Sequence, residues 1–303
     1  MQAIRENTEI KLPSGTQIGS YRLIKHLKQG GMSTIYLAYH VLTRAFVAIK
    51  VVDRYSIDLN MFYREMEITK ALEHEHIVPC LDAGQYGSYF YLVMPYLRGG
   101  TLEDKLNEGL PTLEEVCIVL EQLTSALAYI HSLGLLHRDI KPANILFDHD
   151  NNLYLTDFGI VSWLGEKPGY DGHMLGTPHF VAPEIFEGQV DVRSEVYSVG
   201  ILLYQMLTGF LPFDGASDQM ICQHQRRTKP FVPSFFNPSL PEPVERVILC
   251  ALEKNPDRRF QSVEDLLHAF QIALEVPTSF KHFSTQRQET YQMASLAASA
   301  QRI

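Results

Sequence analysis

The sequence is poor in the features that mark secreted, zinc-binding and redox proteins. Its 303 residues include only 4 cysteines, and no two of these form a C-x-x-C pair. Single cysteines among apolar neighbours do not provide the paired thiols of zinc and redox sites, so we expect buried thiols in a reducing compartment. The cysteine pattern therefore favours a cytoplasmic protein.

Long apolar runs are also missing. The longest, over residues 196–207, is interrupted by Tyr197, Ser198 and Gln205, and the first seven residues have no apolar core. Because a membrane-spanning helix needs about 20 apolar residues, we expect neither a signal peptide nor a membrane span in this chain.

Basic residues are fewer than acidic residues. The chain has 26 Lys and Arg against 35 Asp and Glu, which gives a formal net charge of −9. Such a chain has no positive field that would attract phosphate backbones or anionic lipids. We therefore expect neither nucleic acid nor a membrane surface as a partner.

Length and composition indicate a large folded protein. Hydrophobic residues make up 46% of the sequence, which excludes global disorder. At roughly 150 residues per domain, the length predicts two domains or two lobes.

The first third of the chain has the alternating and apolar patterns of a sheet, with a turn at Gly30-Gly31 and one helix over residues 57–73. Strands are predicted at residues 21–24, 35–38, 46–52, 77–83 and 89–94.

The pattern changes to helices after the two glycines that end the stretch 96–100. T-x-x-E at 112–115 and S-x-x-D at 262–265 are capping signals that open long amphipathic helices. From Pro277 onward the chain is polar, with few large apolar residues, and this pattern predicts a flexible tail.

Charged side chains gather in two short loops on either side of a predicted hairpin. The run H-R-D-I-K-P-A-N at 137–144 is followed, eighteen residues after Asp139, by Asp157 in D-F-G. Oxygen ligands from Asn144 and Asp157 suit Mg²⁺, which binds a few protein oxygens together with water and phosphate. Asp139 is then left to accept a proton.

Lys50 is the one charge on an otherwise apolar strand. A lysine in that position must reach water or find an anion. Glu65, on the predicted helix that follows, can supply the negative charge. Taken alone, the pair fits a structural salt bridge as well as a ligand site.

In combination, these motifs resemble those of the protein kinase family over residues 21–275, and in detail those of bacterial serine/threonine kinases. V-A-I-K at 47–50, the 137–144 run, D-F-G at 157–159 and A-P-E at 182–184 occur in the order of that family. Arg259 is a candidate partner for Glu184 of the last motif.

The resemblance implies an α+β, two-lobed protein kinase fold, with a β-rich N-lobe that contains one main helix and a mostly helical C-lobe. The implied divisions are an N-terminal extension 1–20, the N-lobe 21–94, a hinge 95–100, the C-lobe 101–275 and a tail 276–303.

The resemblance also implies ATP with Mg²⁺, or with Mn²⁺, and a protein substrate with a serine or threonine acceptor, with autophosphorylation as a further expectation. Lys50, paired with Glu65, would hold the α- and β-phosphates. Asp139 would orient the substrate hydroxyl, and Lys141 would steady the transferred phosphoryl group. The metal would bind Asn144 and Asp157, and the nucleotide would contact Gly30, Gly31, Ile35, Ala48, Lys50, Met94, Tyr96, Leu97 and Leu146.

The segment between the D-F-G and A-P-E motifs is expected to bind substrate. By resemblance, Thr177 would bond both Asp139 and Lys141. Kinases of this kind usually carry a phosphorylated threonine in the middle of the segment, and this chain has no threonine between residues 157 and 176. Asp171 is either a fixed negative charge facing Arg138 or an ordinary turn residue.

Three positions depart from the family pattern. Lys28 and Ser33 stand where the phosphate loop has its outer glycines, and Glu195 stands where the family has an aspartate that braces the catalytic loop. We expect Glu195 to keep that bracing role.

Three functions remain open at this point. An active kinase is favoured because Lys50, Asp139, Lys141, Asn144 and Asp157 are all retained. A pseudokinase scaffold that binds nucleotide or a partner is the alternative. A small-molecule phosphotransferase is disfavoured by the segment around Thr177, which in kinases shapes a peptide dock.

Overall fold

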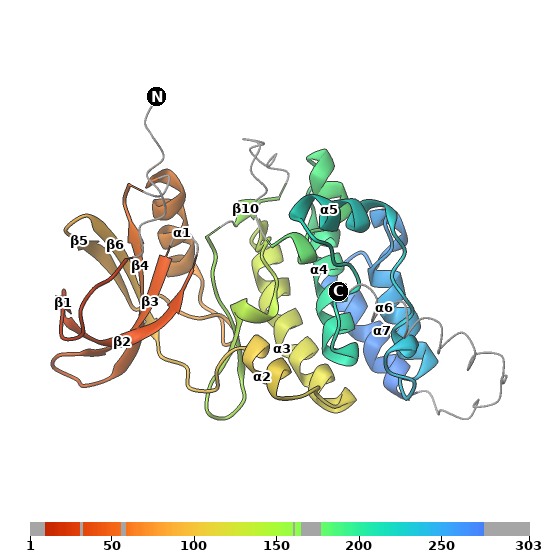
Figure 1. Cartoon of the computed structure of the whole chain (residues 1–303), viewed down its shortest axis with the longest axis horizontal. Coiled ribbons are helices and arrows are strands. Elements are labelled where there is room, and N and C mark those ends of the chain that lie inside the picture. Colours follow the sequence, from red (N-terminus) through yellow and green to blue (C-terminus); the bar gives the residue numbers. More distant parts are fainter. Residues whose placement is uncertain (1–9, 31–32, 56–58, 160, 165–176, 276–303) are drawn as a thin grey trace.

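The computed structural model describes residues 10–30, 33–55, 59–159, 161–164 and 177–275, except for the side chains of residues 59–62 and 65. A lobe built on a sheet and a lobe built of helices lie beside each other, with the chain crossing between them after β6 (Figure 1). This is the α+β, two-lobed arrangement that the sequence predicted.

The N-lobe sheet has six antiparallel strands in the order β1-β2-β3-β4-β6-β5. α1, Leu59–Ala71, lies against it (Figure 1). The strands are β1 Gln17–Ile18, β2 Tyr21–Gln29, β3 Ser33–His40, β4 Phe46–Asp53, β5 Asp82–Tyr86 and β6 Tyr89–Pro95.

One strand prediction was wrong. Residues 77–83 do not form a continuous strand; β5 begins at Asp82, and Ile77 makes only an isolated bridge to Leu155 of the other lobe. Pro79 has no N–H to donate to a ladder, so the chain cannot continue as a paired strand there. The segment instead joins the two lobes.

Both faces of β4 carry apolar side chains, and the side chain of Lys50 lies on one of these two faces. Val47, Ile49 and Val51 belong to one buried cluster, whereas Ala48 belongs to another. Because strand side chains alternate, Lys50 shares the face of Ala48. From that face Lys50 reaches Asp157 of the other lobe.

Residues 10–20, which were expected to precede the N-lobe as an extension, pack onto it. Ile10 and Ile18 are buried in the cluster that contains Tyr36. The Tyr36 hydroxyl donates to the Ile10 carbonyl (2.7 Å) and accepts from the Leu12 N–H (3.0 Å). The N-lobe core is therefore completed by residues ahead of the predicted boundary.

The C-lobe helices surround α4, most of whose residues are buried. Both predicted capping signals are confirmed: Thr112 and Glu115 form a reciprocal capping box, and the Ser262 hydroxyl accepts the Asp265 N–H at 3.0 Å. The helices are α2 Leu102–Glu108, α3 Leu113–Ser132, α4 Val192–Thr208, α5 Asp218–Arg227, α6 Glu242–Ala251 and α7 Val263–Glu275.

Short strands and 3₁₀ turns occupy the sequence between α3 and α4. They are β7 Leu135–Leu136, β8 Ile145–Phe147, β9 Leu153–Leu155, β10 Ser162–Trp163 and the 3₁₀ turns η1 Pro142–Asn144, η2 Pro178–Phe180 and η3 Pro183–Glu187. β8 and β9 form an antiparallel hairpin, and β7 pairs with β10.

The two glycines after β6 let the crossing chain lie directly on this hairpin. The Gly99 N–H donates to the Phe147 carbonyl, and the Phe147 N–H donates to the Gly100 carbonyl, both at 2.9 Å. A Cβ on Gly99 would collide with the Asp148 carbonyl, and Gly100 has a φ of +73°. Neither position therefore accepts a larger residue without strain.

Two expectations from composition bear on the described structure. All four cysteines are free, but they are half-buried rather than fully buried as predicted. Within the described ranges, no helix combines the length and the apolar character that crossing a membrane requires.

A buried ion pair joins distant parts of the C-lobe. Arg259 donates from Nη1 and Nη2 to the two carboxylate oxygens of Glu184, at 2.7 and 2.8 Å. The side chains are 0% and 7% exposed, and the Ser194 hydroxyl also donates to Glu184 (2.8 Å). The pairing expected from sequence is thus present, and it anchors the segment that follows Thr177.

Removal of one partner should be costly. We predict that Arg259→Met lowers the free energy of unfolding by about 3–5 kcal/mol, because it leaves the Glu184 carboxylate buried without a counter-charge. Arg246→Met is the control: Arg246 lies 3.7 Å from Glu242 in an exposed pair, and its loss should cost less than about 0.5 kcal/mol. Equal losses in urea unfolding would contradict the prediction.

Candidate active site

The carboxylate of Asp139 is the point where the predicted catalytic residues meet. Lys141 Nζ donates to Asp139 Oδ2 (2.6 Å) and to the Thr177 hydroxyl (2.8 Å). Thr177 in turn donates to Asp139 Oδ1 (3.1 Å). Asn144 Nδ2 lies 2.9 Å from both Oδ2 and the backbone carbonyl of Asp139. Three side chains from two chain segments therefore hold one carboxylate.

The local sequence explains why these groups converge. Pro142 opens the 3₁₀ turn η1, where a missing N–H costs nothing, and the Asn144 N–H donates to the Lys141 carbonyl at 3.0 Å. This single turn folds the chain back on itself. It brings Asn144 beneath Asp139, five residues earlier.

His137 is a fully buried structural residue, as expected. Its Nδ1 accepts the Asp139 N–H (3.2 Å), so Nε2 carries the proton and donates to the Thr156 carbonyl (3.0 Å). The ring also packs edge-on against Phe158 at 4.9 Å. One imidazole thus fixes the backbone next to both Asp139 and Asp157.

Two non-glycine residues of the site have left-handed backbones. Arg138 and Asp157 both have a φ of +69°. Each such residue costs on the order of 1–3 kcal/mol and persists only where its surroundings hold it. The residue before Asp139 and the aspartate of the D-F-G motif are therefore under strain that neighbouring contacts must offset.

Lys50 and Asp157 form an ion pair across the lobes, with Lys50 Nζ 2.9 Å from Asp157 Oδ1. The ammonium of Lys50 holds the pKa of Asp157 below its usual range, although burial acts in the opposite direction. The side chain of Glu65 lies outside the described residues, so its pairing with Lys50 stays a prediction. Gly31 and Asp171 lie outside them as well.

Glu195 supports the strained backbone of Arg138. Its Oε1 accepts the Arg138 N–H (2.7 Å), and its Oε2 is bonded to His131 Nε2 (2.6 Å). Burial raises the pKa of Glu195, but the bond from His131 and the neighbouring charges hold it below its ordinary value. The brace expected from sequence is present in the structure. His131 was missed, because a histidine near the end of a helix carries no signal of a partner 64 residues away.

An apolar cluster lines the cleft beside these charges. It contains five of the predicted nucleotide contacts, together with Val78, Leu92 and other residues of both lobes. The five are Ile35, Ala48, Met94, Leu97 and Leu146. Sequence segments more than 100 residues apart thus form one apolar surface, as an adenine pocket requires.

An exposed ion pair links the N-lobe to the C-lobe. Lys28, at the end of β2, lies 3.6 Å from the Glu103 carboxylate on α2. Both side chains are exposed, so the pair contributes little energy. Gly30 closes the strand by donating its N–H to the Ser33 carbonyl (2.7 Å).

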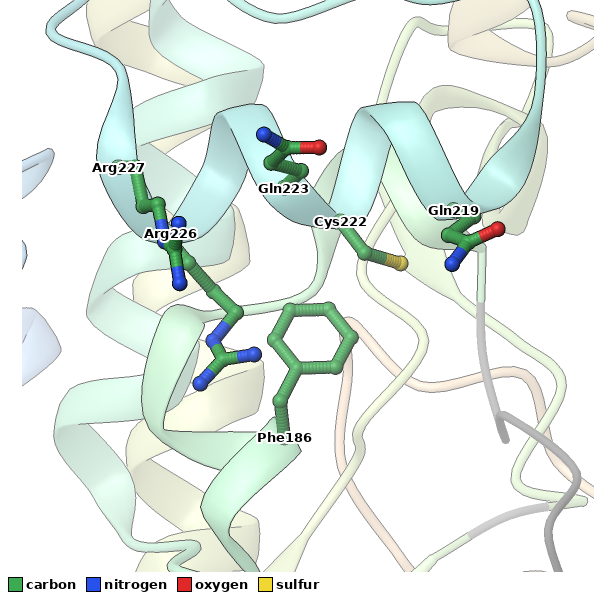
Figure 2. A pocket seen from close by; sticks show the side chains of 6 residues that line it. All are labelled: Phe186, Gln219, Cys222, Gln223, Arg226 and Arg227. Carbon is green, nitrogen blue, oxygen red and sulfur yellow. The ribbon is translucent and has the colours of Figure 1, made fainter.

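A separate groove of about 370 Å³ lies between η3 and α5, away from these residues (Figure 2). None of the predicted site residues lines it. Its lining residues are Phe186, Gln219, Cys222, Gln223, Arg226 and Arg227.

Comparisons with known proteins agree with this geometry. Residues 21–271 match the family model described as "Protein kinase domain". The chain is 34% identical to serine/threonine-protein kinase PrkC of Bacillus subtilis, covering 89% of this chain and 43% of that protein. It is 35% identical to serine/threonine-protein kinase PknJ of Mycobacterium tuberculosis, covering 87% and 47%. The chain therefore spans less than half the length of these relatives.

The Glu195 brace generates a pH-dependent prediction. Glu195→Gln keeps the shape but removes the charge, and it should lower the free energy of unfolding at pH 7 by about 1–3 kcal/mol. Because the pKa of Glu195 is lowered in the folded protein, its contribution is complete above the ordinary value of 4.5 and is lost as the pH falls below it.

Urea unfolding of both proteins between pH 7 and pH 3.5 measures this difference. It should be constant down to about pH 4.5 and then shrink. The matched control is Glu242→Gln, since the Glu242 side chain is 75% exposed. A difference that stays the same throughout this range would show that the charge of Glu195 contributes nothing.

Proposed function

Because this chain belongs to the protein kinase family, we propose that it transfers the γ-phosphoryl group of ATP to a serine or threonine hydroxyl of a protein. The observation that carries the proposal is the set of bonds on Asp139 from Lys141, Thr177 and Asn144, beside the Lys50–Asp157 pair. Phosphoryl transfer depends on positioning and charge neutralisation, and these are the groups it needs.

The nucleotide occupies the cleft between the lobes. The apolar cluster around Ala48 and Leu146 holds the adenine, Met94 lies behind it, and the backbone near Tyr96 and Leu97 borders it. Gly30 and Gly31 cover the phosphates. Lys50, which shares the cleft face of β4 with Ala48, binds the α- and β-phosphates.

Asn144 and Asp157 supply the metal ligands. Asn144 Nδ2 is engaged by Asp139, so its Oδ1 remains to bind a cation, and Asp157 offers a carboxylate kept ionised beside Lys50. Hard oxygen ligands of this number fit Mg²⁺, with Mn²⁺ as the alternative. When bound, the cation neutralises charge on the phosphates.

Asp139 accepts the proton of the substrate hydroxyl as its oxygen attacks the γ-phosphorus. Lys141, already bonded to Asp139, places its ammonium where charge develops on the transferred group. Thr177 bonds both Asp139 and Lys141 and fixes their relative positions.

The Lys141-Pro142 pair is the form of this loop found in serine/threonine kinases, so we propose serine or threonine as the acceptor. Autophosphorylation and a cytoplasmic location, in keeping with the free cysteines, belong to the same proposal.

Labelled ATP with Mg²⁺ and a generic basic protein tests the proposal. Asp139→Asn should lower the transfer rate by about 10²–10⁴-fold, because the general base is lost while the fold is kept. Lys50→Met and Asp157→Ala should also abolish transfer. All three variants should melt within a few degrees of the parent in the absence of ligand.

Two results would overturn the proposal. Equal labelling by the parent and Asp139→Asn would remove the catalytic role of the carboxylate. Nucleotide binding by the parent without any transfer, to protein or to itself, would favour the pseudokinase scaffold instead.

Activity should not require phosphorylation in the middle of the segment between Asp157 and Thr177. That segment has no threonine, and Ser162 is only 4% exposed, so a kinase cannot reach its hydroxyl in this conformation. We predict an immediate linear rate after phosphatase treatment, with residues 157–184 shown by mass spectrometry to be unmodified. A lag that prior phosphorylation of Ser162 or Tyr170 removes would contradict this. A lower rate in Asp171→Asn would support Asp171 as the fixed charge facing Arg138.

A further inference from the structure

The turn η2, Pro178–Phe180, directly follows the threonine that bonds Asp139, and side chains hold all three of its carbonyls. Gln225 Nε2 on α5 donates to the His179 carbonyl (2.5 Å) and lies 3.4 Å from the Pro178 carbonyl. The Ser198 hydroxyl on α4 donates to the Phe180 carbonyl (2.7 Å). Side chains of α4 and α5 therefore bond the turn, in addition to its neighbours in the chain.

Gln225 is fully buried, and its orientation is determined by its partners. A backbone carbonyl can only accept, so the NH₂ group of Gln225 must face the turn. Its Oε1 then faces the Tyr197 hydroxyl, at 2.5 Å, and Tyr197 must donate to it. Tyr197 is also fully buried, so neither group can exchange its partner for water.

Lys254 completes this chain of bonds. Its Nζ lies 3.1 Å from the Tyr197 hydroxyl oxygen, and 3.8 Å from the centre of the Phe213 ring. Because the Tyr197 proton is committed to Gln225, Lys254 must be the donor. Burial lowers the pKa of Lys254 to about 7, but the amine has N–H groups to donate in either charge state. The bonds therefore run in one direction, from Lys254 through Tyr197 and Gln225 to the turn.

Burying the Gln225 amide at this position costs free energy of desolvation. An apolar side chain of similar size would pack there without the cost of removing an amide from water, which hydrogen bonds must offset. The amide is stabilised only while the Pro178 and His179 carbonyls stay within its reach. It thus favours one position of η2, the position in which Thr177 reaches Asp139 and Lys141.

We propose that Gln225, oriented by Tyr197 and Lys254, is a positioning residue that holds η2 in register with Asp139 for the approach of the protein substrate. This inference rests on the proposed function. A hydroxyl that reaches Asp139 must bring its flanking residues past Thr177 and His179, so a displaced turn affects the protein substrate and leaves the nucleotide site untouched.

The test compares three α5 variants in steady-state kinetics. Gln225→Leu removes the donor and the acceptor, and Gln225→Glu keeps the acceptor for Tyr197 but cannot donate to the turn. Both should lower kcat/KM for the protein substrate about tenfold and leave the KM for ATP within twofold of the parent. Gln223→Leu is the matched control, since the Gln223 side chain is exposed and lines the separate groove (Figure 2), whereas Gln225 is buried.

Hydrogen exchange supplies a readout that does not depend on transfer. The Phe180 N–H, which donates to the Thr177 carbonyl at 2.9 Å, should exchange faster in Gln225→Leu and Gln225→Glu than in the parent and in Gln223→Leu. Tyr197→Phe, which frees the amide to rotate but keeps the ring, should show the same change to a smaller degree.

The outcomes separate this inference from the proposed function. Unchanged exchange of the turn, or a KM for ATP that rises as much as kcat/KM for the protein substrate falls, overturns the positioning role. A lower melting temperature with parental kinetics below it shows that Gln225 is only structural, and also overturns it. An inactive parent defeats the proposed function, and it defeats the substrate-positioning role as well, even where the exchange pattern shows that Gln225 holds the turn.

Discussion

The structure of the cleft depends on one carboxylate that must be held still and yet stay reactive. Asp139 is bonded by Lys141, Thr177 and Asn144, and its own backbone N–H is held by His137. Its side chain is only 11% exposed. A negative charge so far removed from water is stable only with such donors around it. In the proposed function the same donors hold it ready to accept the proton of a substrate hydroxyl, so stability and the proposed chemistry make the same demand on these residues.

The rest of the C-lobe serves to keep those donors in place. Arg138 and Asp157 both have left-handed backbones. The buried Glu195 side chain accepts the Arg138 N–H, and Lys50 pairs with the Asp157 carboxylate, which is 41% exposed. Two buried contacts fix the segment that follows Thr177. Gln225 bonds η2, and Arg259 pairs with Glu184 of η3. Glu195, Gln225, Glu184 and Arg259 are all buried, and a hydrogen-bond partner or an opposite charge meets each of them. The core therefore carries its polar groups where the site needs rigidity, and is apolar elsewhere.

Much of this arrangement could be predicted from the sequence, because its signals are local. The lone charge of Lys50 on an apolar strand, the capping signals at Thr112 and Ser262, and the clustered charges of 137–144 all depend on neighbours within a few residues. Resemblance to the kinase family added the longer contacts of Thr177 and Glu195. Contacts without either signal were missed: His131 with Glu195, Gln225 with η2, and the packing of residues 10–20 on the sheet. The strand predicted over 77–83 failed because apolar residues there face the other lobe and not a neighbouring strand, which periodicity cannot distinguish.

We propose separate tasks for neighbouring carboxylates: Asp157 would hold the metal with Asn144, whereas Asp139 would act only on the substrate hydroxyl. Calorimetric titration of ATP, with and without Mg²⁺, into the parent, Asp139→Asn, Asn144→Ala and Asp157→Asn measures this separation directly. The account predicts that Mg²⁺ strengthens ATP binding to the parent and to Asp139→Asn by the same factor, and that this gain falls at least tenfold in Asn144→Ala and Asp157→Asn. A loss of the Mg²⁺ effect in Asp139→Asn as large as that in Asp157→Asn would contradict it.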